Sequence, residues 1–489
     1  MPTASRRGCG EAGRVLVAEP RPVLQTVREP RSCDTASTRP ATVDFSDRHR
    51  TLPARSPRSD SESSAGCGIV NDEASTEAMA ARPPVGGSTD AGLPVATVVL
   101  KLKRARPFFG RHPWVLDSAV SRVEGEPAAG AVVDLTTHDG TFVARGLWNP
   151  ESRIRVRLYA FDPATPLDAG EWRRRIEQAC ALRRALDLDV ADGGCRLVNS
   201  EGDDLSGLIV DRYGPYLAIQ VTALALLPRL DTICDVLETL VAPRGMLLRG
   251  AERGLAKLEG LHLPDRLLRG VAPDGPVFVA EHGLRFGVDL TAGQKTGHYL
   301  DQRDNRLAAA RLARGRRVLD MFCYSGGFAV ACAVTGGARS VLAVDGSPRA
   351  ASLARANAEL NGATTITVEA ADAFEKLDGL VAGGERFGMV VLDPPKFARS
   401  RATVDDALRA YHRVNRLAVD LLEPGGILVT CSCSGSVSRD DFLQMLAGVA
   451  QRGRRTIQLL QVRGAAADHP VSASCLEGEY LTCVIARVV

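Results

Sequence analysis

The chain has 489 residues, of which 45% are hydrophobic and 24% charged, a balance typical of a soluble protein with several domains. Its 61 Lys and Arg nearly offset its 58 Asp and Glu, and the formal net charge of +3 excludes a chain that binds polyanions over its whole surface. No apolar run reaches the roughly 18 residues of a membrane-spanning helix, and the start lacks the apolar core of a secretory signal peptide. The 12 cysteines show no framework spacing and, without an export signal, are interpreted as reduced thiols of a cytoplasmic protein. They form no C-x-x-C pair, so we expect no metal site.

Residues 1–95 differ from the rest, because they are rich in Arg, Pro, Ser, Thr and Gly and lack apolar periodicity. Such a segment cannot bury enough surface to offset its chain entropy, so we predict a disordered extension. An organelle-targeting peptide and a true start nearer Met79 are alternatives, although interspersed acidic residues weaken the first of them.

A small β-rich domain is predicted for residues 96–162, where partly alternating apolar segments are separated by Gly, Asp and Pro. Cations and an aromatic ring gather near its start, and such a set can bind phosphates while the ring stacks on a base. The candidate RNA-binding residues are Lys101, Lys103, Arg104, Arg111 and Trp114. A solvated strand edge with aromatic residues in the core is the alternative interpretation.

Residues 163–286 mix helical and strand patterns, and we predict an α+β middle domain. A helix is expected over 171–188, where five arginines form a basic face that we interpret as solvated. Strand-like stretches follow it, then a helix near 227–240 and a strand at 246–250.

From Val318 onward, strand-like and helical segments alternate strictly. This alternation predicts an α/β, Rossmann-like domain over 287–489, with a mainly parallel seven-stranded sheet. The last strand-like segment, 479–489, follows a loop with no helix, which fits the antiparallel insertion of the class I methyltransferase variant of this fold.

Ligands of such sheets bind at the carboxyl ends of the strands. Asp320, Asp345 and Asp372 follow three successive predicted strands, and a Gly-Gly pair follows the first of them. A carboxylate after the second strand can accept hydrogen bonds from ribose hydroxyls, and one after the third can meet an adenine amino group. The loop is not G-x-G-x-x-G, which favours S-adenosylmethionine over a dinucleotide. The candidate cofactor residues are Asp320, Phe322, Tyr324, Ser325, Gly326, Phe328, Asp345, Asp372 and Asp393.

Two further strand ends carry candidate catalytic residues. Asp393 precedes two prolines that stiffen the loop, and a rigid loop there can clamp a flat base for transfer. Cys431 and Cys433 share one face at the end of the next strand, and Cys433 lies nearer the expected pocket. We predict Cys433 as a nucleophile, with Cys431 as the alternative.

A thiol is useful for one particular methylation. Carbon 5 of cytosine is a poor nucleophile, but addition of a thiolate at carbon 6 makes it enamine-like and able to attack a sulfonium methyl. A base then removes the carbon-5 proton and the thiolate leaves. Methylation of an amino or ring nitrogen needs no cysteine.

With these residues in place, the chain resembles the bacterial 23S ribosomal RNA cytosine-5 methyltransferase I family over residues 96–489. The matching segments are FGRHPWVLDSAV (109–120), LVNSEGDDLSGLIVDRYG (197–214), GQKTGHYLDQRDNR (293–306), VLDMFCYSGGF (318–328), VVLDPPKF (390–397) and TCSCSG (430–435). The resemblance implies an N-terminal PUA domain, a middle domain and a methyltransferase domain that acts on large-subunit ribosomal RNA or its precursor. It also implies that Gln294, Lys295, Thr296 and Arg303 form a wall of the cofactor pocket.

Other interpretations stay open at this point. One alternative is that the chain methylates a guanine nitrogen or another RNA, since Asp-Pro-Pro occurs in several groups of base-methylating enzymes. A binding module without turnover is disfavoured by the full set of strand-end residues, and a dinucleotide oxidoreductase by the missing G-x-G-x-x-G. The sequence does not decide which nucleotide is the target. It leaves open whether the substrate is naked RNA or an assembling subunit, and whether the protein is a homodimer or a monomer.

Overall fold

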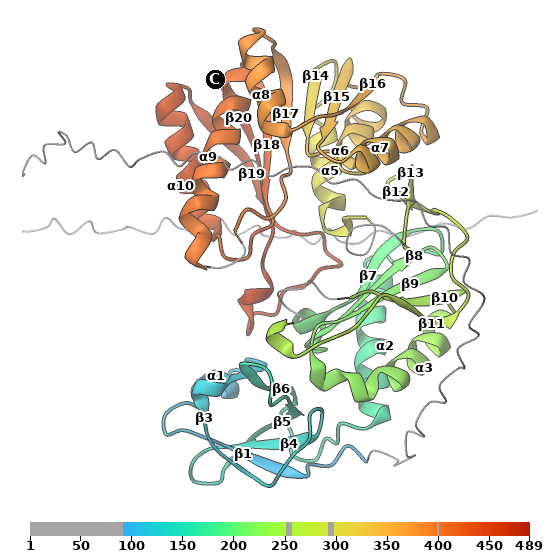
Figure 1. Cartoon of the computed structure of the whole chain (residues 1–489), viewed down its shortest axis with the longest axis vertical. Coiled ribbons are helices and arrows are strands. Elements are labelled where there is room, and N and C mark those ends of the chain that lie inside the picture. Colours follow the sequence, from blue (N-terminus) through green and yellow to red (C-terminus); the bar gives the residue numbers. More distant parts are fainter. Residues whose placement is uncertain (1–90, 251–256, 292–297, 399–400) are drawn as a thin grey trace, which may run out of the picture. The chain divides into compact units, whose positions relative to one another are not determined.

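The computed structural model describes residues 91–250, 257–291, 298–398 and 401–489, which form three large sheets, one hairpin and their helices (Figure 1). The predicted disordered extension lies outside the described residues up to residue 90. Within the described ranges, no helix is long and apolar enough to cross a membrane.

The first sheet has six strands in the order β2-β6-β5-β4-β1-β3, and only the β1–β4 pair is parallel. Its elements are β1 (Ala96–Leu100), α1 (Arg106–Phe109), β2 (Trp114–Leu116), β3 (Val120–Glu124), β4 (Val132–Thr136), β5 (Phe142–Trp148) and β6 (Ile154–Ala160). Val98, Val115, Leu135 and Val156 are completely buried in its core. The alternating apolar positions seen in the sequence therefore face one compact interior.

The second sheet has five strands in the order β11-β10-β9-β8-β7, with β9 and β10 parallel. Its elements are α2 (Ala169–Ala185), β7 (Gly194–Asn199), β8 (Leu208–Tyr213), β9 (Tyr216–Val221), α3 (Leu230–Val241), β10 (Gly245–Leu248) and β11 (Arg266–Gly270). Trp172 and Ile176 of α2 and Ile233 of α3 pack in the core of this sheet.

The solvated basic face predicted for α2 is wrong for two of its five arginines. Arg175 and Arg183 are buried, and they form ion pairs with Glu171 and Asp203. A buried guanidinium needs such a partner because its charge is costly to remove from water.

A hairpin of β12 (Val277–Glu281) and β13 (Leu284–Val288) follows. Phe286 of this hairpin shares a buried cluster with Tyr213 of β8 and with Ala310 and Val330, which lie next to the third sheet.

The third sheet has seven strands in the order β16-β15-β14-β17-β18-β20-β19 (Figure 1). The strands are β14 (Arg317–Met321), β15 (Ser340–Asp345), β16 (Ile366–Ala370), β17 (Phe387–Leu392), β18 (Leu422–Ser432), β19 (Ile457–Arg463) and β20 (Thr482–Val488). Six strands run in the same direction, and β20 runs against them because it pairs antiparallel with both β18 and β19. The predicted α/β class I methyltransferase fold with its antiparallel insertion is confirmed.

Helices cover both faces of this sheet. They are α5 (Arg303–Ala310), α6 (Gly327–Val330), α7 (Pro348–Leu360), α8 (Ala373–Ala382), α9 (Val404–Leu421) and α10 (Arg439–Gly453). Residues of α5, α6 and α7 share one buried cluster with the sheet, and residues of α8, α9 and α10 share another. Because both faces are buried, the parallel strands are almost continuously apolar, and their polar residues gather at the carboxyl ends.

Candidate active site

The loop between β14 and α6 turns sharply over the end of β14. Phe322, Tyr324 and Gly326 have φ angles of 64°, 46° and 77°, in the left-handed region. A Cβ at Gly326 would lie 3.2 Å from the Cβ of Ala354, so glycine suits both the turn and the close approach of α7. The Tyr324 N–H donates to Asp345 Oδ2 at 2.9 Å, which holds the loop against the end of β15.

Asp320 is buried where this loop leaves β14. Its Oδ2 accepts a hydrogen bond from the Ala329 N–H at 2.9 Å, and its Oδ1 has no partner among the described residues. Burial and the neighbouring carboxylate of Asp393 raise the pKa of Asp320 well above its usual range. A buried oxygen without a donor at a strand end suits the binding of a ligand that donates a hydrogen bond.

Two other predicted carboxylates accept backbone hydrogen bonds. The half-buried Asp345 accepts from Tyr324 through Oδ2 and from the Ser347 N–H through Oδ1 at 2.8 Å. These bonds fix its carboxylate, and each oxygen keeps a lone pair for a ribose hydroxyl. Asp372 is exposed and caps α8, since its Oδ1 accepts from the N–H groups of Phe374 and Glu375 at 2.9 and 3.0 Å. Capping explains Asp372 structurally, and its contact with adenine stays a prediction.

The remaining loop residues have different surroundings. Ser325 is buried, with its Oγ 3.4 Å from His298 Nδ1, and its carbonyl accepts from Asn357 Nδ2 at 2.9 Å. Phe322 is half-buried against the core that contains α8 to α10. Phe328 is buried in the opposite core, so its packing supports the loop from beneath.

Arg303, predicted for a wall of the cofactor pocket, is held by contacts within the protein. Its guanidinium is buried, forms an ion pair with Asp468 and donates to the Gly194 carbonyl at 3.2 Å. These contacts join α5 to β7 and to the loop before β20, which is a structural role. Gln294, predicted for the same wall, lies outside the described residues together with Lys295 and Thr296.

The ends of β17 and β18 bring Asp393 and Cys433 to one place. β17 lies between β14 and β18, and the Asp393 N–H is 3.5 Å from the Met321 carbonyl of β14. The Cys433 thiol is 3.7 Å from the carbonyl of Pro394, the residue after Asp393. Cys433 is half-buried, so this thiol lies at the edge of the interior, next to the stiff Asp-Pro-Pro loop.

Cys431 lies deeper than Cys433. It is completely buried and is the direct cross-strand neighbour of Cys483 on β20. The hydrogen bond with Cys483, followed by burial, raises the pKa of the Cys431 thiol well above its usual range. A buried thiol that resists ionisation is a poor nucleophile.

One polar neighbour of this site is missing from the sequence interpretation. Gln302 follows Leu300 and Asp301 in a short turn before α5, and its Nε2 donates to Asp393 Oδ1 at 3.0 Å. The amide is buried, with 3% of the residue exposed. In the sequence, only its place in the GHYLDQRDNR segment indicates a role for Gln302, and that segment does not show that the amide contacts Asp393.

The sequence pattern of the S-adenosylmethionine-dependent methyltransferase family matches residues 270–459, and that of PUA-like domains matches residues 98–161. Ribosomal RNA large subunit methyltransferase I of Aeromonas hydrophila is 39% identical over 395 residues, which cover 80% of this chain and 99% of that protein. The Salmonella arizonae protein of the same name is 38% identical over 393 residues, 80% of this chain and 97% of that protein. The chain belongs to the ribosomal RNA large subunit methyltransferase I family.

Solved structures agree with the fold of this methyltransferase. A structure described as an S-adenosylmethionine-dependent methyltransferase from Streptococcus mutans matches with a TM-score of 0.68 and 18% identity, covering 80% of this chain and 99% of that one. A second structure, a methyltransferase in complex with S-adenosylhomocysteine, matches equally well at 19% identity. The cofactor of this family is S-adenosylmethionine, and Asp320 and Asp345 fit it, because both carboxylates lie at adjacent strand ends.

We predict that Asp345→Ala weakens binding of S-adenosylmethionine by about 1.5–3 kcal/mol, the usual value of hydrogen bonds to a charged group. Isothermal titration calorimetry on the full chain measures this change. Because Asp345 also holds the Tyr324 N–H, Asp345→Asn serves as a comparison that keeps one acceptor oxygen. Unchanged affinity in the alanine variant would remove Asp345 from the cofactor site.

The PUA-like part of this methyltransferase exposes most of the predicted RNA-binding residues. Lys101, Lys103, Arg104 and Arg111 are exposed, and Lys101 Nζ donates to the Ser118 carbonyl at 3.0 Å. Phe109, which lies between Arg104 and Arg111 in the sequence, is 60% exposed. Exposed cations and an exposed aromatic ring in one segment suit binding of RNA.

Trp114 lies in a different environment from these cations. Its Nε1 donates to Glu201 Oε1 at 2.9 Å, and the Arg157 guanidinium lies 5.9 Å from its ring centre. The indole thus joins the first sheet to the turn after β7. This contact is sufficient to explain why Trp114 is half-buried, and the explanation needs no bound RNA.

His112, Cys475 and Glu477 bring three possible metal ligands within 4.8 Å of one another. The Trp114 N–H lies 3.3 Å from His112 Nδ1, and His112 Nε2 is 3.4 Å from Glu477 Oε1. A backbone donor at Nδ1 leaves the proton on Nε2, facing the carboxylate, whereas a metal at Nε2 needs its lone pair. The geometry favours a hydrogen bond between the two segments.

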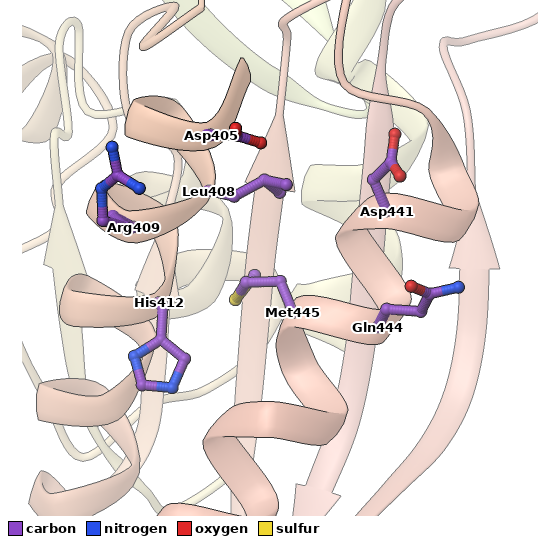
Figure 2. Close-up of a pocket in the computed structure, with 7 residues that line it drawn as sticks. All are labelled: Asp405, Leu408, Arg409, His412, Asp441, Gln444 and Met445. Atoms are coloured by element: carbon purple, nitrogen blue, oxygen red, sulfur yellow. The ribbon is translucent and has the colours of Figure 1, made fainter. Parts of the chain in front are cut away.

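A groove of about 420 Å³ lies between α9 and α10 (Figure 2). Its lining residues are Asp405, Leu408, Arg409, His412, Asp441, Gln444 and Met445. None of them is a predicted site residue, and their mixed charges favour no particular ligand.

Proposed function

We propose that this methyltransferase transfers a methyl group from S-adenosylmethionine to carbon 5 of a cytosine in large-subunit ribosomal RNA, through a covalent bond to Cys433. The RNA class is supported by the relatives' name, Ribosomal RNA large subunit methyltransferase I, and by the match to PUA-like domains. The cytosine-5 chemistry is supported by one observation above all. A half-buried thiol, Cys433, lies at a strand end beside the Asp393 loop.

In this proposal the Cys433 thiolate adds to carbon 6 of the base, which makes carbon 5 nucleophilic. S-adenosylmethionine, when bound, would supply an electrophilic methyl group to that carbon and would leave as S-adenosylhomocysteine. Loss of the carbon-5 proton to a base then lets the thiolate leave, so that cysteine is regenerated. Asp393, with the prolines after it, is proposed to hold the flat base so that carbon 5 and carbon 6 are correctly placed.

The product distinguishes this proposal from methylation of a guanine nitrogen. We expect a single cytosine of the large-subunit ribosomal RNA to carry 5-methylcytosine in cells with the gene and to be unmodified in cells without it. Bisulfite sequencing of that RNA measures the change. A difference found only as methylguanosine, by mass spectrometry of the digested RNA, would contradict the proposal.

A further inference from the structure

Three hydrogen bonds connect Arg463 of β19 to the carboxylate of Asp393. Arg463 Nε donates to Asn305 Oδ1 at 2.8 Å, and Asn305 Nδ2 donates to Gln302 Oε1 at 2.7 Å. Gln302 Nε2 then donates to Asp393 Oδ1 at 3.0 Å. Asn305 and Gln302 are 1% and 3% exposed, so water does not compete for these amides.

The direction of this chain of hydrogen bonds is fixed at its far end. A guanidinium can only donate, so Asn305 must turn its oxygen toward Arg463 and its amino group toward Gln302. The same amino group donates to the Gly464 carbonyl at 3.1 Å, which gives it a second reason to point that way. Gln302 must therefore accept with its oxygen and present its N–H₂ to Asp393.

We propose that Gln302 is a positioning residue for methyl transfer, which orients the Asp393 carboxylate, and that Asn305 and Arg463 set the orientation of Gln302. This rests on the proposed role of Asp393 in holding the base. A carboxylate that binds a flat base must be held within about 0.5 Å and 10–20° of its productive geometry, and a buried neutral donor fixes it without adding charge.

The first test is Gln302→Glu in the full chain, which keeps the shape of the side chain but turns its donor into an acceptor that faces Asp393. We expect kcat for incorporation of labelled methyl groups into unmodified large-subunit ribosomal RNA to fall about ten- to a hundred-fold. Any change in the KM for RNA and in the affinity for S-adenosylmethionine is expected to be smaller than the loss in kcat, because Gln302 contacts the Asp393 side chain and neither ligand directly. Gln302→Ala removes the donor without a new charge and serves if Gln302→Glu does not fold.

The second test acts at a distance from Asp393. Asn305→Asp still accepts from Arg463 but cannot donate to Gln302, so the glutamine amide loses the partner that orients it. We expect kcat to fall in Asn305→Asp as well, and to fall no further when Asn305→Asp is added to Gln302→Ala. A matched control is Gln220→Glu, which makes the same change on β9 of the second sheet. Gln220 Nε2 donates to the Gly250 carbonyl at 3.2 Å and takes no part in the hydrogen bonds that lead to Asp393.

The outcomes separate a positioning role from simple stability. A kcat loss that exceeds any change in KM, with unchanged Tm and a non-additive double variant, supports the proposal. Wild-type kcat in both Gln302 variants, or a kcat loss that is matched by a fall in Tm, overturns it. Methyl incorporation counts any methylated base, so a failure of the cytosine-5 assignment would be seen in the product while this test still reports on Gln302.

Discussion

Cys433→Ala is expected to lower methyl transfer roughly a thousand-fold or more, because the covalent route through carbon 6 is lost. Affinity for S-adenosylmethionine should stay unchanged, since Cys433 lies beside Pro394 and not in the loop after β14. Single-turnover transfer to unmodified large-subunit ribosomal RNA and calorimetry with the cofactor measure the two quantities. Loss of cofactor binding in this variant would mean that the thiol supports the cofactor site instead.

A trapped adduct tests the same thiol directly. RNA with 5-fluorocytosine at the target should remain covalently bound to the wild-type enzyme. The elimination step normally removes the carbon-5 proton, and fluorine in its place cannot leave as a cation. Cys431→Ala should keep the adduct, since Cys431 is completely buried against Cys483. An adduct lost only in Cys431→Ala moves the nucleophile back by two residues. Methylation without any adduct in the wild type rules out the covalent mechanism.

The strand ends were predictable because their physical cause is local. Buried parallel strands such as β14 and β17 are continuous apolar runs, so the first polar residue after each run marks a carboxyl end. Asp320 and Asp345 therefore both lie near the carboxyl ends of neighbouring strands, as the alternation of strands and helices implies, with Asp320 beside Ala343 in the register. Cys433 was preferred over Cys431 on the same ground, and the burial of Cys431 agrees with that order.

Partners far apart in the chain were not predictable. Arg303 and Asp468 form an ion pair across 165 positions, and no pattern near Arg303 points to that partner. Trp114 donates to Glu201 across 87 positions, a contact between the first sheet and the turn after β7 that no pattern near Trp114 indicates. Gln302 is a single amide in a polar segment, and only the folded turn brings it to Asp393. In each case the decisive contact arises from tertiary packing.

Asp468 is the most connected of these long-range partners. It is completely buried in the loop between β19 and β20, and its Oδ2 accepts from Arg303 and from the Arg196 N–H, the latter at 2.9 Å. Its Oδ1 lies 2.9 Å from His469 Nδ1, and its carbonyl accepts from Arg183 at 2.7 Å. The Asp468 side chain thus connects α5 to β7, and its backbone carbonyl contacts α2.

Asp468→Ala is expected to lower the free energy of unfolding by about 3–5 kcal/mol, since it leaves the buried Arg303 charge without its partner. Differential scanning calorimetry of the full chain should show a clear fall in Tm. A matched control is Asp406→Ala, because Asp406 pairs with Arg409 on the surface, where both side chains are more than 70% exposed. Such a pair contributes about 0–1 kcal/mol, so the control should keep its Tm.

The pH dependence shows whether the charge of Asp468 causes this effect. Burial raises the pKa of Asp468, but the hydrogen bond and charge of His469 and the charge of Arg303 outweigh it, so the pKa lies below its usual range. As the pH falls, Asp468 is protonated first in the unfolded chain, at about pH 4. The stabilisation that its carboxylate gives to the folded state is therefore complete above about pH 5 and decreases as the pH falls further. The Tm difference between wild type and Asp468→Ala should therefore be constant from pH 7 to about pH 5 and shrink below that. A difference that is equally large at about pH 3.5 would show that the loss comes from packing and not from the ionised carboxylate.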